Sequence, residues 1–120
     1  MKRVGSPSRH AVRAAIAVSM RHRGAKLQRT AQQLGVSGRS LQRRLADMGT
    51  SYSELVAEVR LDTACRLLAE SDERICDIAV RVGFSSASSF NRTFMRLIKM
   101  QPNAYRRQRS EQQRKKSAAR

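Results

Sequence analysis

Residues 75–85, ICDIAVRVGFS, decide the fold of this chain. Their order is an apolar residue, an alanine four positions later, then an apolar residue, a glycine, a second apolar residue and a serine. Residues 27–37, LQRTAQQLGVS, repeat that order. Once one residue is inserted, the match continues, because residues 41–45 (LQRRL) correspond to residues 90–94 (FNRTF). The chain therefore contains an internal repeat.

Each copy is typical of two helices joined by a tight turn. A small alanine four positions after an apolar residue lets a second helix cross closely over the first. The glycine, Gly35 or Gly83, suits a turn position with positive φ. The serine that follows, Ser37 or Ser85, offers an N-cap to the next helix. We therefore predict a helix-turn-helix in each copy.

The rest of the chain is predicted to be helical as well. Ser8 is expected to cap a first helix that ends at Gly24, with Val12, Ile16 and Met20 on one face. Residues 53–68 carry apolar side chains around much of a helical circumference, which predicts a helix packed against both copies. No strand pattern occurs.

These patterns predict an all-α chain with two helix-turn-helix subdomains, residues 8–52 and 71–108, joined by a central linker helix, residues 53–70. Residues 1–7 and 109–120 are predicted to be flexible basic tails, the second either disordered or a frayed helix, because no apolar face continues beyond about Gln108.

Positive charge is distributed unevenly along the chain, whose formal net charge is +16. Residues 1–46 contain eleven Lys or Arg and no acid, and residues 86–120 contain ten and one. Residues 47–85 contain four basic and eight acidic residues. Two positive regions around an acidic middle suit a polyanion that is contacted at two places.

The sequence argues against several other classes of protein. No nucleophile, phosphate-loop or zinc-protease motif is present, so we expect no enzyme and no cofactor. Cys65 and Cys76 lack a metal-ligand pattern, and we expect both to be small buried apolar residues and no metal to bind. No membrane span and no secretory signal occur in the sequence, so we expect a cytoplasmic protein without membrane contact.

At these residues the chain resembles the DNA-binding domain of the AraC/XylS family of transcription regulators. The more specific part lies in the second copy, where residues 75–85 are followed by Phe90-x-Arg92-x-Phe94 and Pro102-x-x-Tyr105-Arg106. The stretch RLDTACRLL, residues 60–68, also fits, and the resemblance covers about residues 8–107. Two residues depart from the family pattern: Lys99 stands where glycine is common, and Tyr52 where proline is common.

The resemblance implies seven helices, with recognition helices at about residues 38–47 and 86–97 that enter successive major-groove segments of double-stranded DNA. Members of the family usually carry a separate effector-sensing or dimerisation domain on the N-terminal side. We therefore expect the chain to be the C-terminal DNA-binding part of a longer regulator, monomeric as a domain, with RNA polymerase as a further partner. A stand-alone small activator is the alternative.

Helical spacing selects the side chains that would read bases. In the first copy, Leu41 and Leu45 must point inward, which leaves Arg39, Gln42 and Arg43 outward. Glutamine pairs with adenine and arginine with guanine. In the second copy, Phe90 and Phe94 point inward, so the outward residues are Ala87, Ser88, Asn91 and Arg92. For Arg92, a phosphate contact is an equally good interpretation. The first copy has the longer side chains, and we expect it to contribute more base specificity.

Residues near helix starts and ends are candidates for phosphate contacts. For the serines and the threonine, helix capping alone is an equally good interpretation. The candidates are Thr30, Ser37, Arg44, Ser85, Ser86, Arg96 and Lys99.

Two other functions fit the same sequence less well. A non-specific nucleic-acid-binding protein would use charge alone, but aromatic residues are only 4% of the chain and three of them belong to the predicted core. A protein-interaction module would not need two arginine-bearing helix faces. Sequence-specific binding of DNA, with regulation of transcription, is the function that the sequence favours.

Overall fold

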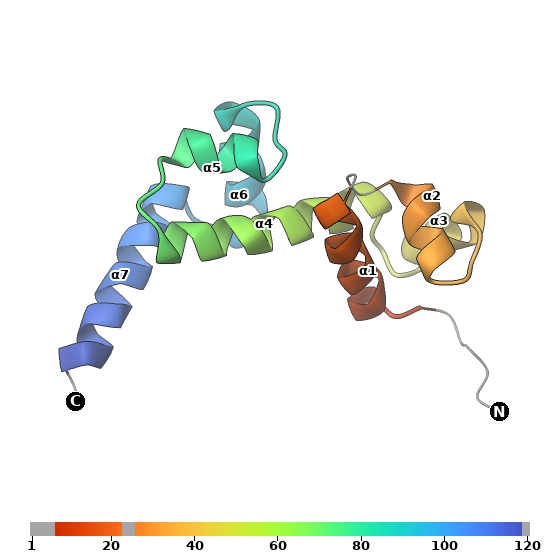
Figure 1. The fold of residues 1–120 in the computed structure, drawn as a ribbon, viewed down its shortest axis with the longest axis horizontal. Helices are drawn as coiled ribbons and strands as arrows, with labels where there is room; N and C mark the ends of the chain where they lie inside the picture. The colour runs from red at the N-terminus through yellow and green to blue at the C-terminus, as the bar shows by residue number, and fades with distance from the viewer. Residues whose placement is uncertain (1–6, 23–25, 119–120) are drawn as a thin grey trace. The chain divides into compact units, whose positions relative to one another are not determined.

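The computed structural model describes residues 7–22 and 26–118, in which all regular structure is helical (Figure 1). This confirms the predicted all-α class with seven helices. The helices are α1 (Arg9–His22), α2 (Leu27–Gln33), α3 (Gly38–Asp47), α4 (Tyr52–Glu70), α5 (Ile75–Arg81), α6 (Ala87–Ile98) and α7 (Pro102–Ala118).

The chain divides into two compact units, and the boundary falls inside α4. The first unit ends at Val59, and the second begins at Arg60. α4 is apolar around much of its circumference because its two halves belong to different cores. Leu55, Val56 and Val59 are buried in the core of the first unit, whereas the residues from Leu61 onward contribute to the second.

The core of the first unit is built from all four of its helical segments. Val12 and Ile16 of α1 are fully buried, and Met20 packs against them as the four-residue spacing predicts. Ala31 of α2 is also buried, where its small side chain allows close crossing by α3. Glu58 forms ion pairs with Arg9 and Arg13, which fasten α1 to the first half of α4.

The core of the second unit is more aromatic. Phe90 and Phe94 of α6 are fully buried with ring centroids 5.6 Å apart. Phe84 from the α5–α6 turn and Tyr105 of α7 meet them edge to face, with centroids 5.4 Å and 5.7 Å away. Edge-to-face pairs add to the stabilisation that burial alone provides. The aromatic chain therefore joins the turn, α6 and α7 into one core.

The turns of the two copies have the predicted backbone, but their caps differ. Gly35 has φ +73° and Gly83 φ +104°, as a tight helix-turn-helix requires. Ser37 caps α3, its Oγ accepting a hydrogen bond from the backbone N–H of Ser40. In the second copy the cap is Ser86, not Ser85 as predicted. The inserted residue lies in this turn, so the helix begins one position later than in the first copy.

The start of α1 agrees with the sequence prediction. The Oγ of Ser8 accepts a hydrogen bond from the backbone N–H of Ala11, which satisfies one of the free donors at the helix start. Gly24, predicted to end this helix, lies outside the described residues.

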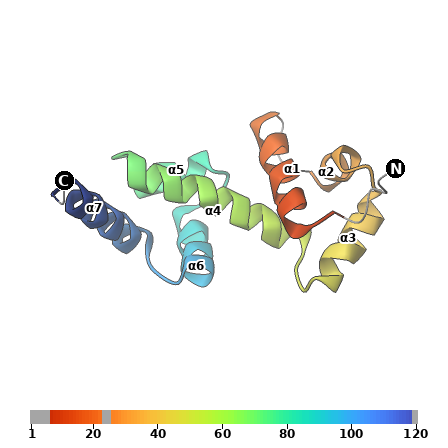
Figure 2. The same ribbon diagram turned by 90° about the horizontal axis from the view of Figure 1, so that it is seen from below.

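α7 extends further than predicted. The sequence led us to expect a flexible tail from residue 109, but the helix continues to Ala118. Pro102 at its first position suits a helix start, and the arginine, glutamine and lysine residues that follow are good helix formers. Extending a helix that is already packed costs no new nucleation. In Figures 1 and 2 the outer part of α7 projects away from the other helices of its unit, and residues 107–118 are exposed.

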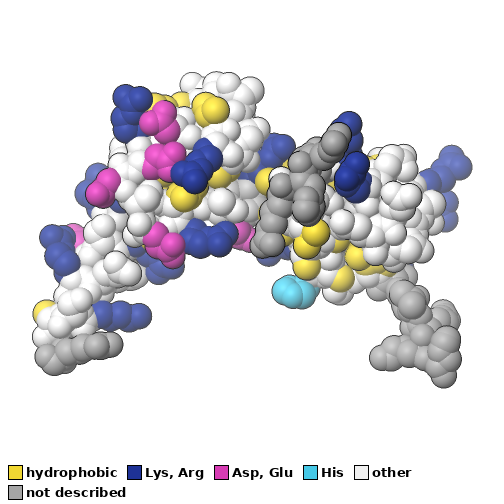
Figure 3. Space-filling view, in the orientation of Figure 1, with side chains coloured by type: hydrophobic (Ala, Val, Ile, Leu, Met, Phe, Trp, Pro, Cys, Tyr) yellow, Lys and Arg dark blue, Asp and Glu magenta, His cyan; other side chains and the backbone are white. Residues whose placement is uncertain are grey.

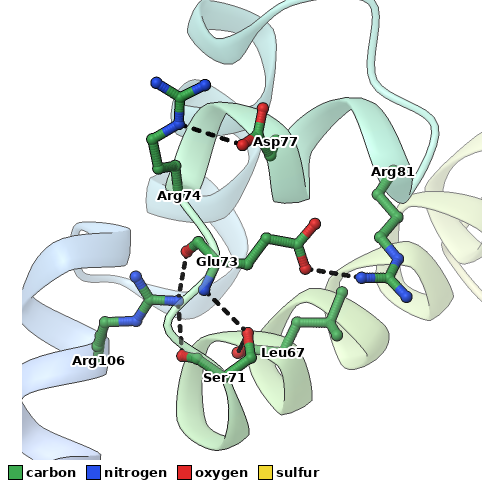
Figure 4. A network of polar contacts seen from close by, with 7 residues as sticks. All are labelled: Leu67, Ser71, Glu73, Arg74, Asp77, Arg81 and Arg106. Atoms are coloured by element: carbon green, nitrogen blue, oxygen red, sulfur yellow. Dashed lines mark hydrogen bonds and ion pairs between the residues drawn. The ribbon is translucent and has the colours of Figure 1, made fainter.

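A network of hydrogen bonds ties the junction between α4 and α5 to α7 (Figure 4). The guanidinium of Arg106 donates to the carbonyl oxygens of Leu68, Ser71 and Glu73 at 2.9, 3.1 and 2.8 Å. Carbonyl groups at the end of a helix lack hydrogen-bond donors within that helix, and Arg106 supplies such donors. Glu73 also forms an ion pair with Arg81 at the far end of α5. Arg106 therefore joins the α4–α5 junction to α7, and the Glu73–Arg81 ion pair joins it to the end of α5.

The two cysteines occupy different environments. Cys65 is partly buried against the second core, and burial raises the pKa of its thiol. Cys76 is exposed, so the prediction that both cysteines are buried was wrong for this residue. On α5 the inward positions are taken by Ile78, Ala79 and the partly buried Ile75, and Cys76 lies beside that face rather than on it.

Candidate nucleic-acid interface

α3 has one apolar face and one polar face. Leu41 and Leu45 are almost completely buried. Arg39, Gln42 and Arg43 are all exposed, and the helical repeat places them together on the side opposite the two leucines. The cap at Ser37 and the turn before it position this face relative to α2. The structure thus brings together the three residues predicted to read bases in the first copy.

α6 repeats the arrangement in the second unit. Phe90 and Phe94 hold its inner face in the core, and Ser88, Asn91 and Arg92 are exposed on the opposite side. Ser86 orients the first turn of α6. The side chains that α6 offers are shorter than those of α3, apart from Arg92.

The six predicted reading residues retain their hydrogen-bonding capacity. Within the described part of the chain, none of the ion pairs or side-chain hydrogen bonds includes Arg39, Gln42, Arg43, Ser88, Asn91 or Arg92. Arginine donates in a planar fork, and asparagine and glutamine both donate and accept. Such groups can form paired hydrogen bonds to the edges of bases in a major groove.

The predicted phosphate contacts fall into two groups in the structure. Arg44, Ser85, Arg96 and Lys99 have exposed side chains. Ser37 and Ser86 are exposed too, but their hydroxyls already accept the capping hydrogen bond of α3 or α6. Lys99 ends α6 in the left-handed conformation, with φ 70°, a backbone conformation that glycine adopts without steric penalty.

Thr30 does not belong to this surface. It lies inside α2 rather than at its start, and it is completely buried. Its hydroxyl is 2.7 Å from the hydroxyl of Tyr52 at the start of α4. Burial raises the pKa of the Tyr52 phenol, so the group stays protonated and able to donate. The prediction that Thr30 contacts phosphate was therefore wrong, because the sequence did not reveal this partner.

The spacing of α6 reveals a surface residue that the sequence prediction missed. Met95 is 45% exposed, and it lies three and four positions after Arg92 and Asn91, on the same face. The sequence prediction did not include Met95, although helical spacing alone places it outward. An apolar side chain on a reading face can contact the methyl group of thymine.

Of the two reading helices, α3 carries one acid, the exposed Asp47 at its last position, and α6 carries none. The other acidic side chains belong to other parts of the chain. In the view of Figure 3 they gather around α5 and the end of α4. Two of these acids are engaged by arginines, Asp77 by Arg74 and Glu73 by Arg81. α3 and α6 carry no acid in their first turns. The helix faces suited to a polyanion are therefore those of α3 and α6, and not that of α5.

The described residues contain no group of three or more His, Cys, Asp or Glu that could hold a metal ion. None of the helices in this part of the chain is long and apolar enough to cross a membrane.

Comparison with known proteins identifies similar sequences. Residues 30–108 match a family model described as a helix-turn-helix domain. The chain is 35% identical over 80 residues to the ornithine utilization regulator of Pseudomonas aeruginosa, which covers 67% of this chain and 24% of that protein. It is 40% identical over 76 residues to the HTH-type transcriptional regulator VirS of Mycobacterium tuberculosis, covering 63% and 22%. The chain thus matches less than a quarter of the length of these relatives.

Solved structures share the fold. The transcriptional regulator CdpR from Pseudomonas aeruginosa superposes with a TM-score of 0.68 and 38% identity, over 82% of this chain and 31% of CdpR. A transcriptional regulator from Chromobacterium violaceum, described as an AraC-type DNA-binding domain-containing protein, gives a TM-score of 0.68 and 30% identity. That match covers 81% of this chain and 91% of the other.

Proposed function

Because the chain belongs to the AraC-type helix-turn-helix family, we propose that it binds double-stranded DNA sequence-specifically and thereby regulates transcription. The observation that carries this proposal is the pair of helices α3 and α6. Each buries two large apolar residues at i and i+4 and exposes polar side chains on the opposite face. An α-helix with such a face fits the major groove of B-DNA.

In the first unit, Arg39, Gln42 and Arg43 read base edges. Arginine donates to the O6 and N7 acceptors of guanine, and glutamine pairs with adenine through both of its polar atoms. Support comes from their shared, exposed face and from the absence of competing partners within the described residues.

In the second unit, Asn91 reads adenine and Arg92 reads guanine or holds a phosphate. Ser88 is small enough to allow close approach of the helix and can accept or donate one hydrogen bond. Met95, on the same face, contacts a thymine methyl group.

Around these faces, positively charged and hydroxyl side chains contact phosphates and set the register on the duplex. Arg44, Arg96 and Lys99 act through charge. Ser85 offers a free hydroxyl, and Ser37 and Ser86 contribute at the starts of α3 and α6, where helix N-termini favour anions.

The same proposal implies a cellular compartment, a protein partner and an oligomeric state. Transcription in bacteria places the chain in the cytoplasm, with RNA polymerase as a protein partner. Since one chain carries two reading helices, it can bind an asymmetric site as a monomer. The relatives are about four times longer than the matched region. Effector sensing and dimerisation, which the family resemblance implies, are not assigned to the two reading helices.

Selection of binding sites from random duplex DNA near physiological salt tests the proposal. We expect an extended, asymmetric motif to be enriched. The double variant Arg39→Ala, Arg43→Ala should lose preference at a few adjacent positions of that motif. Arg66→Ala, which removes a charge from an exposed position of α4, serves as the control and should leave the motif unchanged.

The net charge of +16 favours a second candidate, a non-specific nucleic-acid-binding protein. Such a protein would bind through phosphate neutralisation alone and would show steep salt dependence without base preference. Selection that enriches no motif, despite measurable binding, would support this candidate and contradict sequence-specific recognition.

A further inference from the structure

Arg60, a residue of α4 in the second unit, reaches the turn between α5 and α6. Its guanidinium carbon is 5.9 Å from the centroid of the Phe84 ring. A Cβ placed on Gly83 would be 3.0 Å from Nε and 3.2 Å from Cζ of Arg60. The guanidinium therefore packs against the turn that leads directly into the reading helix α6, in space that the missing side chain of Gly83 leaves open.

This cation has no anionic partner among the described residues. Arg60 is partly buried, and its Nε is shielded from solvent without a hydrogen-bond acceptor. Glu58, close to it in sequence, is paired with Arg9 and Arg13 instead. Burial of a charged group without a partner is costly, and contact with one aromatic ring compensates for only part of that cost.

A phosphate group would supply the anion that the site lacks. Guanidinium matches phosphate oxygens in a planar, bidentate geometry, and it is the side chain that proteins favour for such contacts. Nε of Arg60 is shielded and lacks a partner, and no hydrogen bond or ion pair of the described residues includes the terminal nitrogens. Ser85 and Ser86, exposed hydroxyl residues, follow Phe84 in the same turn.

We infer that Arg60 binds a phosphate of the DNA backbone beside the α5–α6 turn and so helps to set the register of α6. The inference rests on the proposed DNA binding, but not on its sequence specificity. The sequence offered no indication of this role, because Arg60 lies outside both copies of the repeat and meets the turn only in the folded chain.

The competing explanation is that Arg60 only packs against Phe84. Salt dependence separates the two, because log K falls with log salt concentration by about 0.9 for each phosphate neutralised. Removing one phosphate contact should thus lower the slope by about 0.9 and affect all sequences alike. Loss of packing alone should lower the melting temperature without changing the slope.

The test uses the full chain and a duplex of random sequence. Arg60→Met keeps the packing volume and removes the charge, Arg60→Gln removes the charge but stays polar, and Arg60→Lys keeps the charge. Arg66→Met is the matched control, because it removes an exposed charge from another face of α4. Thermal melting shows which variants are folded. One folded neutral variant, Arg60→Met or Arg60→Gln, is enough for the test.

We expect R60M or R60Q to bind DNA more weakly than the original chain. The ratio of the two affinities should decrease roughly threefold between 50 and 200 mM salt, as one lost phosphate contact requires. R60K should keep a slope close to that of the original chain. An unchanged slope in the folded neutral variants, or an equal decrease in R66M, would overturn the assignment. If no motif is selected while R60M still lowers the slope, sequence-specific function fails and the Arg60 assignment stands.

Discussion

Two glycines at equivalent positions of the repeat are constrained to different degrees. Both Gly35 and Gly83 have positive φ, which side chains other than that of glycine adopt at a cost. A Cβ on Gly35 would meet nothing within 4 Å, whereas a Cβ on Gly83 would press against Arg60. In addition, φ +104° lies outside the left-handed region that an L-residue can occupy, while φ +73° lies at its edge.

We therefore expect Gly83→Ala to destabilise the chain more than Gly35→Ala. Strain alone should cost about 1 kcal/mol at Gly35, and the combined strain and contact about 2 kcal/mol or more at Gly83. Denaturant unfolding of the two variants measures the difference. Equal losses would contradict both the argument from φ and the argument from contact with Arg60.

Lys99 is the only described non-glycine residue with positive φ. Lys99→Gly should raise the free energy of unfolding by about 1 kcal/mol, because glycine adopts the left-handed conformation without a steric penalty. Lys99→Ala is the matched control, since it removes the same charge but keeps the strain. Both variants should weaken DNA binding equally if Lys99 contacts phosphate. A stabilised alanine variant would contradict the strain argument.

Among the elements, α7 combines two roles in one helix. Its first turns belong to the core, through Tyr105 and the hydrogen bonds of Arg106. Its outer part, residues 107–118, is exposed and mostly basic or polar. Apart from Arg109, whose guanidinium carbon is 5.5 Å from the centroid of the Tyr105 ring, the outer part has no contact with the aromatic core, and its charge is available to a polyanion.

Deleting residues 109–120 should weaken DNA binding and flatten its salt dependence without changing the selected motif. The deleted segment contributes charge, but neither of the two reading faces. A chain with Arg114, Lys115 and Lys116 replaced by glutamine keeps helix-forming residues and is the control. It removes three of the five basic residues of the segment and should reproduce part of the loss. A changed motif in either protein would mean that α7 takes part in base recognition.

At the scale of the whole molecule, both units contain a helix-turn-helix, but they differ in the side chains that their reading helices expose. The first presents Arg39, Gln42 and Arg43, all long side chains with several polar atoms. The second presents Asn91 and Arg92 beside the smaller Ser88. Each well-formed bidentate contact discriminates between bases by about 1–3 kcal/mol. More such contacts are available to α3 than to α6.

Single-base changes in the selected site should therefore reduce affinity more under α3 than under α6. Binding titrations with a set of duplexes, each carrying one changed base pair, provide the measurement. The duplexes should be assigned to α3 or α6 by using Gln42→Ala and Asn91→Ala, which should each abolish discrimination at their own position. Equal average penalties for the two parts of the site would contradict the prediction.

Local patterns in the sequence were enough to predict most of the fold. Apolar spacing placed Val12, Ile16 and the leucines of α3 in the core, and glycine chemistry located the two turns. The prediction of the site was less complete. Helical periodicity shows which side chains of α3 and α6 are exposed, but it does not show which distant residues a side chain contacts in the folded chain. Thr30 and Arg60 show the difference: each contacts a residue more than twenty positions away, Tyr52 and Phe84 respectively.

The sequence by itself determined the helical class, the repeat, the turns and the outward faces of α3 and α6. Each of these depends on residues within one or two helical turns of one another, and such interactions are encoded in residue type and spacing. Only the tertiary structure decided that Thr30 is buried against Tyr52 and that Arg60 lies against the α5–α6 turn. Those outcomes depend on how close packing brings distant segments together, which no local pattern records.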